Sequence, residues 1–363
     1  MSNRFNGICT FFWIAASSIL GFLILFNVSS GASSHQNETV IHASQYWDGG
    51  LDATTQNNIT VAIATTVLHP GPSLTTWLDY HLRWVQHVVI YMDDPNELPV
   101  FEQLCENRPV TLLKGSQVEP KMTPESRLIR RQMANMRHAI DLLKEGGYTW
   151  LLHIDLDELL LGPLVDSHAW TRDPKVGLVT FTNHEAIPVD FETSSPFTDC
   201  VYFWVNGVDR NSKFLAYGNG KSAVRLGPGV EPRGAHSFSG YNGRALIPSG
   251  EEAMILHYPY PSYEHWLRKF NFYSQFSDHW FGDRQAPKIL DFMLQSRDAV
   301  QGAHKTGDWA STRAFFSKRV LDPASIKEAI SEGKIRQYVP FADLQMNRWA
   351  LPPWKIFYVF SVL

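Results

Sequence analysis

Apolar segments of strand length alternate with amphipathic helical segments from Val61 onward, and this alternation limits the fold more than any other feature. The run VAIATTVL at 61–68 has the near-continuous apolar character of a strand that is buried on both faces. Further strands are expected at HVVIYM (87–92), VTLLKG (110–115) and TWLLHI (149–154). Strands separated by helices in this way predict an α/β fold with a mostly parallel sheet and flanking helices.

The helix expected before the fourth strand has the clearest pattern in the chain. Its apolar residues recur at spacings of four and three: Ile129, Met133, Met136, Ile140 and Leu143. Gly146 and Gly147 then end the helix. The half of the chain after Gly162 is less periodic, which is typical of loops and short strands.

An uncharged apolar run at 8–28 is long enough to span a bilayer as a helix, which takes about 20 residues. Arg4 precedes the run and no Lys or Arg follows until Arg83, so we expect residues 1–7 in the cytosol. The alternative is a cleaved signal peptide, because small residues follow at 29–32. The run is longer than the apolar part of most signal peptides, which favours an uncleaved signal-anchor.

Residues 29–60 are rich in Ser, Thr, Asn, Gln and Gly and contain the glycosylation sequons Asn37-Glu38-Thr39 and Asn58-Ile59-Thr60. This composition is typical of a solvated stem. The expected order is therefore a cytosolic tail, a membrane anchor, a stem and one lumenal domain at 61–363, which describes a single-pass type II membrane glycoprotein.

Charge and cysteine content exclude some classes of protein. The net charge is −4, without the basic excess that nucleic-acid binding requires, so no nucleic acid partner is expected. Three cysteines are too few for a disulfide scaffold or a multi-cysteine zinc site. Cys9 lies in the apolar run, and the sequence leaves open whether Cys105 and Cys200 pair.

The fourth expected strand ends in an acidic segment, His153-Ile154-Asp155-Leu156-Asp157-Glu158. In open α/β sheets, ligands bind at the carboxyl ends of the strands. Asp155 and Asp157 are two residues apart, so they project from the same face of an extended backbone. Two such carboxylates repel each other unless a cation lies between them, and oxygen ligands favour Mn²⁺ or Mg²⁺. The alternative is a pair of solvated carboxylates in a turn.

Four segments together resemble the GT-A glycosyltransferases of family 92 (DUF23) and the related family-2-like group. They are WLDYH with VVIYMDD after it, RRQMANM through IDLDELLL, KSAVR with His236 beyond, and LHY with Trp266 and Lys269. They cover about 61–269. Two departures stand out: the family's W…FG stretch has no clean counterpart near 181–185, and Leu226 replaces the proline expected after Arg225.

The resemblance implies a Rossmann-like GT-A fold and a Golgi enzyme whose catalytic domain is lumenal. Such an enzyme is expected to transfer a hexose, often galactose, from a UDP-sugar to a glycan acceptor with inversion. It implies that Asp157 binds the metal and that Asp155 binds the metal or the donor ribose. His236 is the candidate third metal ligand, with His257 as its competitor.

Further donor-binding residues are expected around this segment. Lys221 and Arg225 have no acidic neighbour in the sequence and are expected to pair with diphosphate oxygens. Asp93 and Asp94 follow the second strand, where GT-A folds hold the uracil or ribose, and Arg131 lies beside the apolar stripe of the long helix. The alternatives are surface cations, a β-turn and a solvated helix face, respectively.

An inverting transfer needs a general base for the acceptor hydroxyl. Glu185 is the catalytic candidate because it is the first acidic residue after the apolar segment at 176–182, with Asp199 and Asp209 as alternatives. Glu158 is expected to orient its neighbours. Aromatic residues that could floor a sugar site are Trp266, Phe270, Trp280 and Phe281, although core packing is favoured for the first two. The apolar end at 354–363 is too short to span a membrane as a helix.

Two other functions stay open. A metal-dependent hydrolase would use the same acidic segment but needs further His or Asp ligands for a second metal. A non-catalytic glycan-binding homologue would keep the fold and lose metal-dependent nucleotide binding.

Overall fold

The computed structural model describes residues 41–42, 59–116, 124–162, 170–205, 220–249, 252–278 and 291–341. The chain divides into two units, Met1–Glu38 and Thr39–Leu363, and every described residue belongs to the second. Within the described ranges no helix has the length and apolarity needed to cross a membrane. The expected anchor 8–28, both sequon asparagines, Asp209, Trp280, Phe281 and the segment 354–363 lie outside the described residues.

The main sheet has eight strands in the order β1-β4-β3-β2-β5-β10-β7-β13. Their bounds are β1 (Ile41–His42), β4 (Val110–Lys114), β3 (His87–Met92), β2 (Val61–Val67), β5 (Trp150–His153), β10 (Lys221–Arg225), β7 (Val176–Phe181) and β13 (Arg244–Leu246). The neighbours β4, β3, β2 and β5 are parallel, whereas β1 and β10 run antiparallel to their neighbours. The mainly parallel central sheet is confirmed, and β1 adds to it a strand from the segment expected to be a stem.

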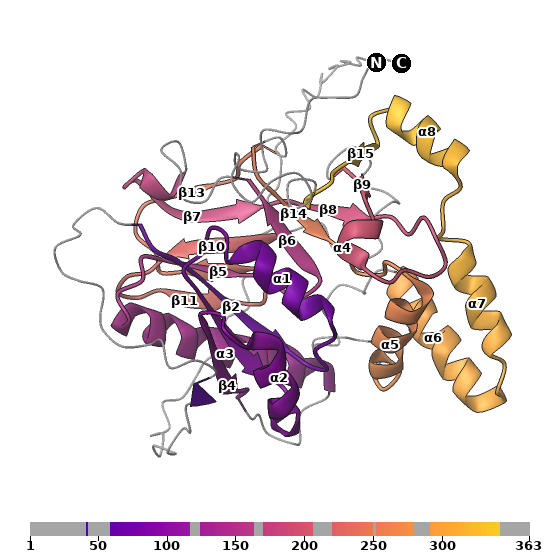
Figure 1. Ribbon diagram of the computed structural model, residues 1–363, viewed down its shortest axis with the longest axis horizontal. Coiled ribbons are helices and arrows are strands. Elements are labelled where there is room, and N and C mark those ends of the chain that lie inside the picture. The colour runs from indigo at the N-terminus through magenta and orange to yellow at the C-terminus, as the bar shows by residue number, and fades with distance from the viewer. Residues whose placement is uncertain are drawn as a thin grey trace, which may run out of the picture. The chain divides into compact units, whose positions relative to one another are not determined.

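Helices cover both faces of this sheet (Figure 1). Alternate residues of β2 show why: Ile63 packs in the core under α1 (Ser73–His81) and α2 (Leu98–Cys105), whereas Ala64 packs in the core under α3 (Pro124–Glu145). The apolar stripe predicted for the long helix is confirmed, because Met136, Ile140 and Leu143 are buried in that second core.

A second sheet has the order β15-β9-β8-β14-β6 and places β6 at one edge. Its strands are β15 (Ile335–Gln337), β9 (Tyr202–Trp204), β8 (Asn183–Ala186), β14 (Met254–His257) and β6 (Glu158–Leu161). A two-stranded sheet joins β11 (Glu231–Arg233) to β12 (Ser237–Ser239). Short helical elements are η1 (Pro95–Glu97), η2 (Trp170–Arg172) and α4 (Pro196–Asp199).

Between β14 and β15 of the second sheet the chain forms the helices α5 (Tyr263–Tyr273), α6 (Asp291–Thr306), α7 (Trp309–Ser317) and α8 (Pro323–Ser331) (Figure 1). The sequence pattern did not predict α6, α7 or α8. Trp266 and Phe270 of α5 are fully buried in an aromatic core with Phe292 and Phe316, so the core-packing interpretation of these two residues is confirmed.

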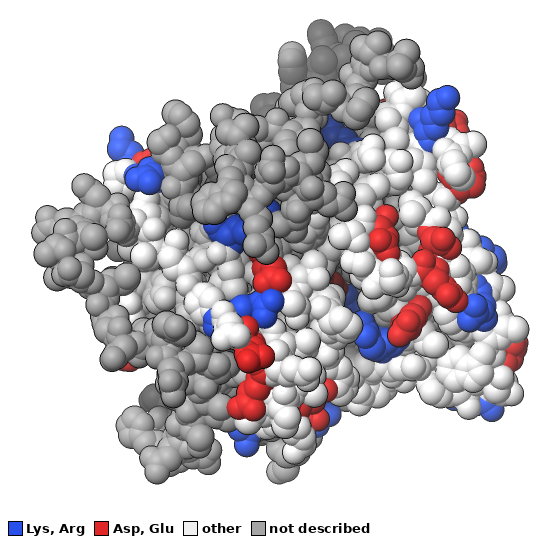
Figure 2. All heavy atoms as spheres, viewed as in Figure 1, with Lys and Arg blue, Asp and Glu red and all other residues white. Residues whose placement is uncertain are grey.

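Cys105 and Cys200 are both buried free thiols, so the pairing that the sequence left open is not formed. Burial raises the pKa of each thiol to about 12, which keeps it protonated and unreactive. On the face drawn in Figure 2, the described acidic and basic side chains are interspersed.

Candidate functional site

The acidic segment is a turn that joins the two large sheets. β5 ends at His153 and β6 begins at Glu158, so Asp155 and Asp157 lie between strands of different sheets. The Glu158 backbone N–H donates to the Asp155 carbonyl over 3.1 Å, and the Glu158 carboxylate accepts from the Asp155 N–H over 2.7 Å. The expectation of one extended backbone with both aspartates on the same face is therefore wrong, because Glu158 folds the segment back on itself.

Asp155 is paired with a buried lysine from the neighbouring strand. The Lys221 ammonium lies 2.5 Å from Asp155 Oδ2 and 3.8 Å from Glu158 Oε2, and it donates to the Ala235 carbonyl over 3.2 Å. β10 pairs with β5 so that Ser222 lies opposite His153, which brings Lys221 to the end of β5. The Lys221 side chain is only 1% exposed. Lys221 is thus an internal counter-ion, and its neutralising partners are distant in sequence.

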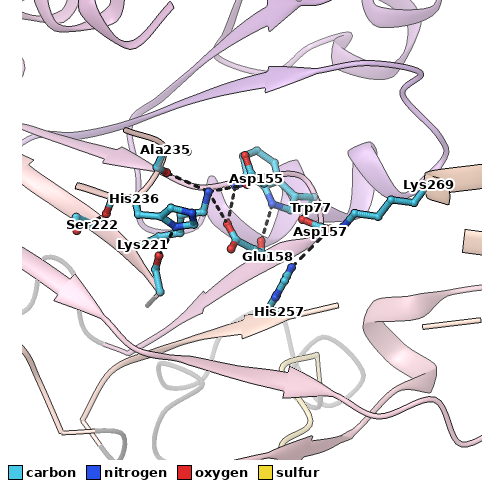
Figure 3. A network of polar contacts seen from close by, with 11 residues as sticks. Trp77, Asp155, Asp157, Glu158, Lys221, Ser222, Ala235, His236, His257 and Lys269 are labelled. Atoms are coloured by element: carbon cyan, nitrogen blue, oxygen red, sulfur yellow. Dashed lines mark hydrogen bonds and ion pairs between the residues drawn. The ribbon is translucent and has the colours of Figure 1, made fainter. Parts of the chain in front are cut away.

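Asp157 is paired with residues of the second half of the chain (Figure 3). The Lys269 ammonium of α5 lies 2.9 Å from Asp157 Oδ2, and His257 Nε2 of β14 lies 3.7 Å from the same oxygen. In Figure 3 Lys221 and Lys269 approach the turn from opposite sides. Each aspartate therefore has its own lysine.

The two lysines keep the aspartates ionised. Burial raises the pKa of each aspartate, but Lys221 beside Asp155 and Lys269 beside Asp157 more than offset it and hold both pKa values below the ordinary range. Glu158 differs, because burial dominates and raises its pKa to about 8. The turn thus presents two ionised carboxylates above one buried carboxyl group.

Helix α1 fixes the backbone of β6 from the other side. The Trp77 indole N–H donates to the Glu158 carbonyl over 2.7 Å, and the Tyr80 hydroxyl donates to the Leu160 carbonyl over 3.0 Å. His81 Nε2 accepts from the Leu160 N–H over 3.3 Å. These three buried side chains form hydrogen bonds with backbone groups of an edge strand.

His236 has the tautomer that a metal ligand needs. Its Nδ1 lies 2.8 Å from the Gly220 carbonyl, which can only accept, so Nδ1 carries the proton and Nε2 the lone pair. Burial lowers the pKa of His236 to about 4, so the imidazole is neutral. Gly220 itself has φ +63°, and a Cβ there would lie 1.7 Å from the Phe181 carbonyl oxygen.

Asp155 and Asp157 supply the oxygen donors that a hard divalent cation takes. Among the described residues, no three His, Cys, Asp or Glu side chains are grouped to hold one ion, so Asp155, Asp157 and His236 are not assembled into a metal centre. The two ionised carboxylates supply oxygen donors, and Mg²⁺ or Mn²⁺ commonly takes its remaining ligands from phosphate and water.

The other predicted donor-binding residues have internal partners. The Arg131 guanidinium pairs with both oxygens of Asp93, at 2.6 and 2.8 Å, at the carboxyl end of β3. Asp94 accepts from the Asn96 N–H and caps η1, which agrees with the turn interpretation. The structure therefore brings Asp93 and Arg131 together as partners of each other.

Arg225 does not reach the acidic turn. It lies opposite Trp150 at the far end of β10 and β5, with its guanidinium 4.7 Å from the centre of that indole ring. Its N–H groups donate to the carbonyls of Thr171, Asp173 and Val176. These contacts account for Arg225 as a structural residue.

Glu185 lies in β8 opposite His257, which in turn lies opposite Glu158. The three residues share one face of the second sheet and are each at most 1% exposed. Asp199 accepts hydrogen bonds from Thr193 and Ser195 near the start of α4. Glu185 is thus buried, and its assignment as the general base stays a prediction.

Sequence reasoning missed the ionic partners of the turn. Lys269 was quoted only as part of a family-like segment, and His257 only as the competitor of His236 for the metal, although both contact Asp157. The signal was present in the order LHY followed by Lys269, but the sequence does not show that this segment folds against a turn 112 residues earlier.

Known proteins resemble part of the chain. The chain is similar to two Arabidopsis thaliana proteins described as glycosyltransferase-like, at 29% and 32% identity over 157 residues, or 38% of this chain. The matches span only 30% and 35% of those relatives, about a third of their length. No family model matches the chain.

Two solved structures align with part of the chain. A 4-diphosphocytidyl-2C-methyl-D-erythritol synthase from Anaerococcus prevotii covers 46% of this chain and 70% of its own, with a TM-score of 0.23 and 8% identity. A cytidylyltransferase from Leptospira borgpetersenii covers 47% and 61%, with a TM-score of 0.25 and 14% identity. TM-scores this low do not establish a shared fold.

Proposed function

We propose that this chain is a glycosyltransferase that binds the diphosphate of a nucleotide-sugar at the Asp155–Asp157 turn. The observation that carries the proposal is the pair of carboxylates just beyond the end of β5, each beside its own lysine, in a mainly parallel sheet. Ligands bind at such strand ends in open α/β sheets. The similarity to glycosyltransferase-like proteins over part of the chain supports the same reaction class.

In this reaction the oxygen of an acceptor hydroxyl attacks the anomeric carbon of the donor sugar. The bond from that carbon to the β-phosphate oxygen breaks, its electron pair stays on the phosphate, and the hydroxyl proton passes to a base. Mn²⁺ or Mg²⁺, held by Asp155 and Asp157, would supply neutralisation of the departing diphosphate. Lys221 and Glu158 hold Asp155 and its backbone in place.

The finer assignments follow from the family resemblance. We propose a UDP-sugar donor, with galactose favoured, a glycan hydroxyl as acceptor, and inversion with Glu185 as the base. We also propose that the apolar run at 8–28 anchors the protein in the Golgi membrane as a single-pass type II protein with residues 61–363 in the lumen.

Calorimetric titration of UDP into the full chain in mild detergent, with and without Mn²⁺, tests the proposal. We expect binding that requires Mn²⁺ and is at least about tenfold weaker in Asp157→Asn, because a charge-assisted contact is lost. Asp79→Asn is the matched control, since Asp79 pairs with Arg108 at the surface and should leave UDP affinity unchanged. Glycan binding without any UDP binding would instead favour a non-catalytic homologue.

A further inference from the structure

The two lysines at the acidic turn differ in how tightly they are held. Lys221 is 1% exposed and has Asp155, Glu158 and the Ala235 carbonyl around its ammonium group. Lys269 is 27% exposed, and its carboxylate partner Asp157 is 33% exposed. Removing Lys221 from its partners would strand buried charges, whereas Lys269 can exchange its partner at the edge of the site.

Besides its ion pair with Asp157, the Lys269 ammonium group makes a weak contact with an aromatic ring. The group lies 5.3 Å from the centre of the Tyr260 ring, a cation–π contact that is weaker than an ion pair and tolerates small displacements. Lys269 stands on α5 directly before Phe270, which is fully buried, so the backbone beneath it is anchored. A flexible four-carbon side chain on a fixed backbone suits a charge that moves between neighbouring anions.

We propose that Lys269 is a phosphate-binding residue, whose ammonium group transfers from Asp157 to the diphosphate of the bound nucleotide. This inference rests on the proposed function. A diphosphate placed at the turn brings a second anion within reach of Lys269, and its greater charge competes with the single charge of Asp157. The transfer also frees an Asp157 oxygen for a divalent cation, so Lys269 and the cation exchange places at that carboxylate.

Lys269→Met tests this exchange, because methionine keeps most of the length of the side chain and removes its charge. Calorimetry on the full chain should show UDP binding in Mn²⁺ weakened by roughly tenfold to a hundredfold, the range for one lost charge-assisted hydrogen bond. Mn²⁺ binding without nucleotide should become tighter, because no ammonium group competes for Asp157. A general structural defect would weaken both.

Arg268→Met is the matched control, since Arg268 is the adjacent, exposed cation on the same helix. It should change neither affinity by more than about twofold. Equal losses in the two variants, or unchanged UDP affinity in Lys269→Met, would overturn the role of Lys269 and leave the proposed function intact. Failure of the wild-type chain to bind UDP at all would overturn both proposals.

A second measurement uses only the wild-type chain, so a folding defect of a variant cannot affect it. Acylation of lysines in the wild-type chain, followed by mass spectrometry, should be slowed at Lys269 at least about threefold by UDP with Mn²⁺, because the phosphate covers its ammonium group. Lys318 is an exposed reference whose rate should not change. Equal rates at Lys269 with and without bound UDP would contradict the transfer.

Discussion

The two sides of the acidic turn are built from different interactions. On one side, α1 supports β6 through neutral hydrogen bonds from Trp77, Tyr80 and His81. The ionic side is a set of contacts rather than one face: Lys221 pairs with Asp155 and Lys269 with Asp157, and the two lysines approach from opposite directions (Figure 3). Neutral buried hydrogen bonds hold a backbone in place but interact weakly with a charged ligand. Ion pairs, by contrast, can exchange a partner for such a ligand. The α1 side therefore holds the backbone of the turn, and the lysine side contains the charged groups that the proposed ligand would meet.

Trp77→Ala should break the neutral side most severely. The indole is fully buried and its N–H donates to the Glu158 carbonyl, so the variant leaves a large cavity and removes this hydrogen bond. We expect a loss of about 4 kcal/mol in the free energy of unfolding, measured by urea denaturation. A loss below about 1 kcal/mol would mean that α1 does not support β6.

Lys221→Met should be the most damaging change on the ionic side. Asp155 would lose its buried counter-ion, at a cost of about 3 kcal/mol in the free energy of unfolding. Restoring stability by the added change Asp155→Asn in a double-mutant cycle would identify the pair as the cause. Independent, additive effects of the two changes would contradict the ion pair.

Lowering the pH should reduce the free energy of unfolding through His81, which belongs to the neutral side. Burial lowers its pKa to about 3, whereas the unfolded chain has an ordinary histidine pKa of about 6.5. The unfolded state therefore binds the proton first, so this stability is complete above about pH 6.5 and declines as the pH falls toward 3.

Between pH 6.5 and 5 the decline from His81 alone amounts to about 2 kcal/mol. His81→Gln should be less stable than the wild type at pH 7 but should lose about 2 kcal/mol less on going to pH 5. Parallel pH profiles for the two proteins, from denaturation curves, would show that His81 is not held neutral.

Tyr80→Phe should have the smallest effect on the neutral side. It removes only the hydroxyl that donates to the Leu160 carbonyl and leaves the ring in place. We expect about 1 kcal/mol of lost stability and unchanged UDP affinity. A change in UDP affinity without a change in melting temperature would contradict the separation between a side that supports the backbone and a side that binds the ligand.

Much of the main sheet could be predicted from the sequence because its strands are local apolar runs. The segments at 61–68 and 87–92 and the stripe of the long helix all depend on residues close in the chain. The division of Ile63 and Ala64 between two cores follows directly from strand periodicity.

The partners within the site could not be predicted in the same way. Lys221 and Asp155 are 66 residues apart and meet because β10 inserts antiparallel beside β5, a pairing that no local pattern encodes. Trp77 reaches the Glu158 carbonyl across 81 residues only because β6 belongs to a separate sheet. Arg131 and Arg225 were likewise not recognised as partners of groups within the protein, because those groups are distant in the sequence.

The most direct test of the central claim measures UDP affinity and melting temperature together in Asp157→Asn and Tyr80→Phe. If the ionic side binds the donor diphosphate, Asp157→Asn should lose at least about tenfold in Mn²⁺-dependent UDP affinity. Tyr80→Phe should lower only the melting temperature. Full UDP affinity in Asp157→Asn would contradict the claim that the turn is the donor site.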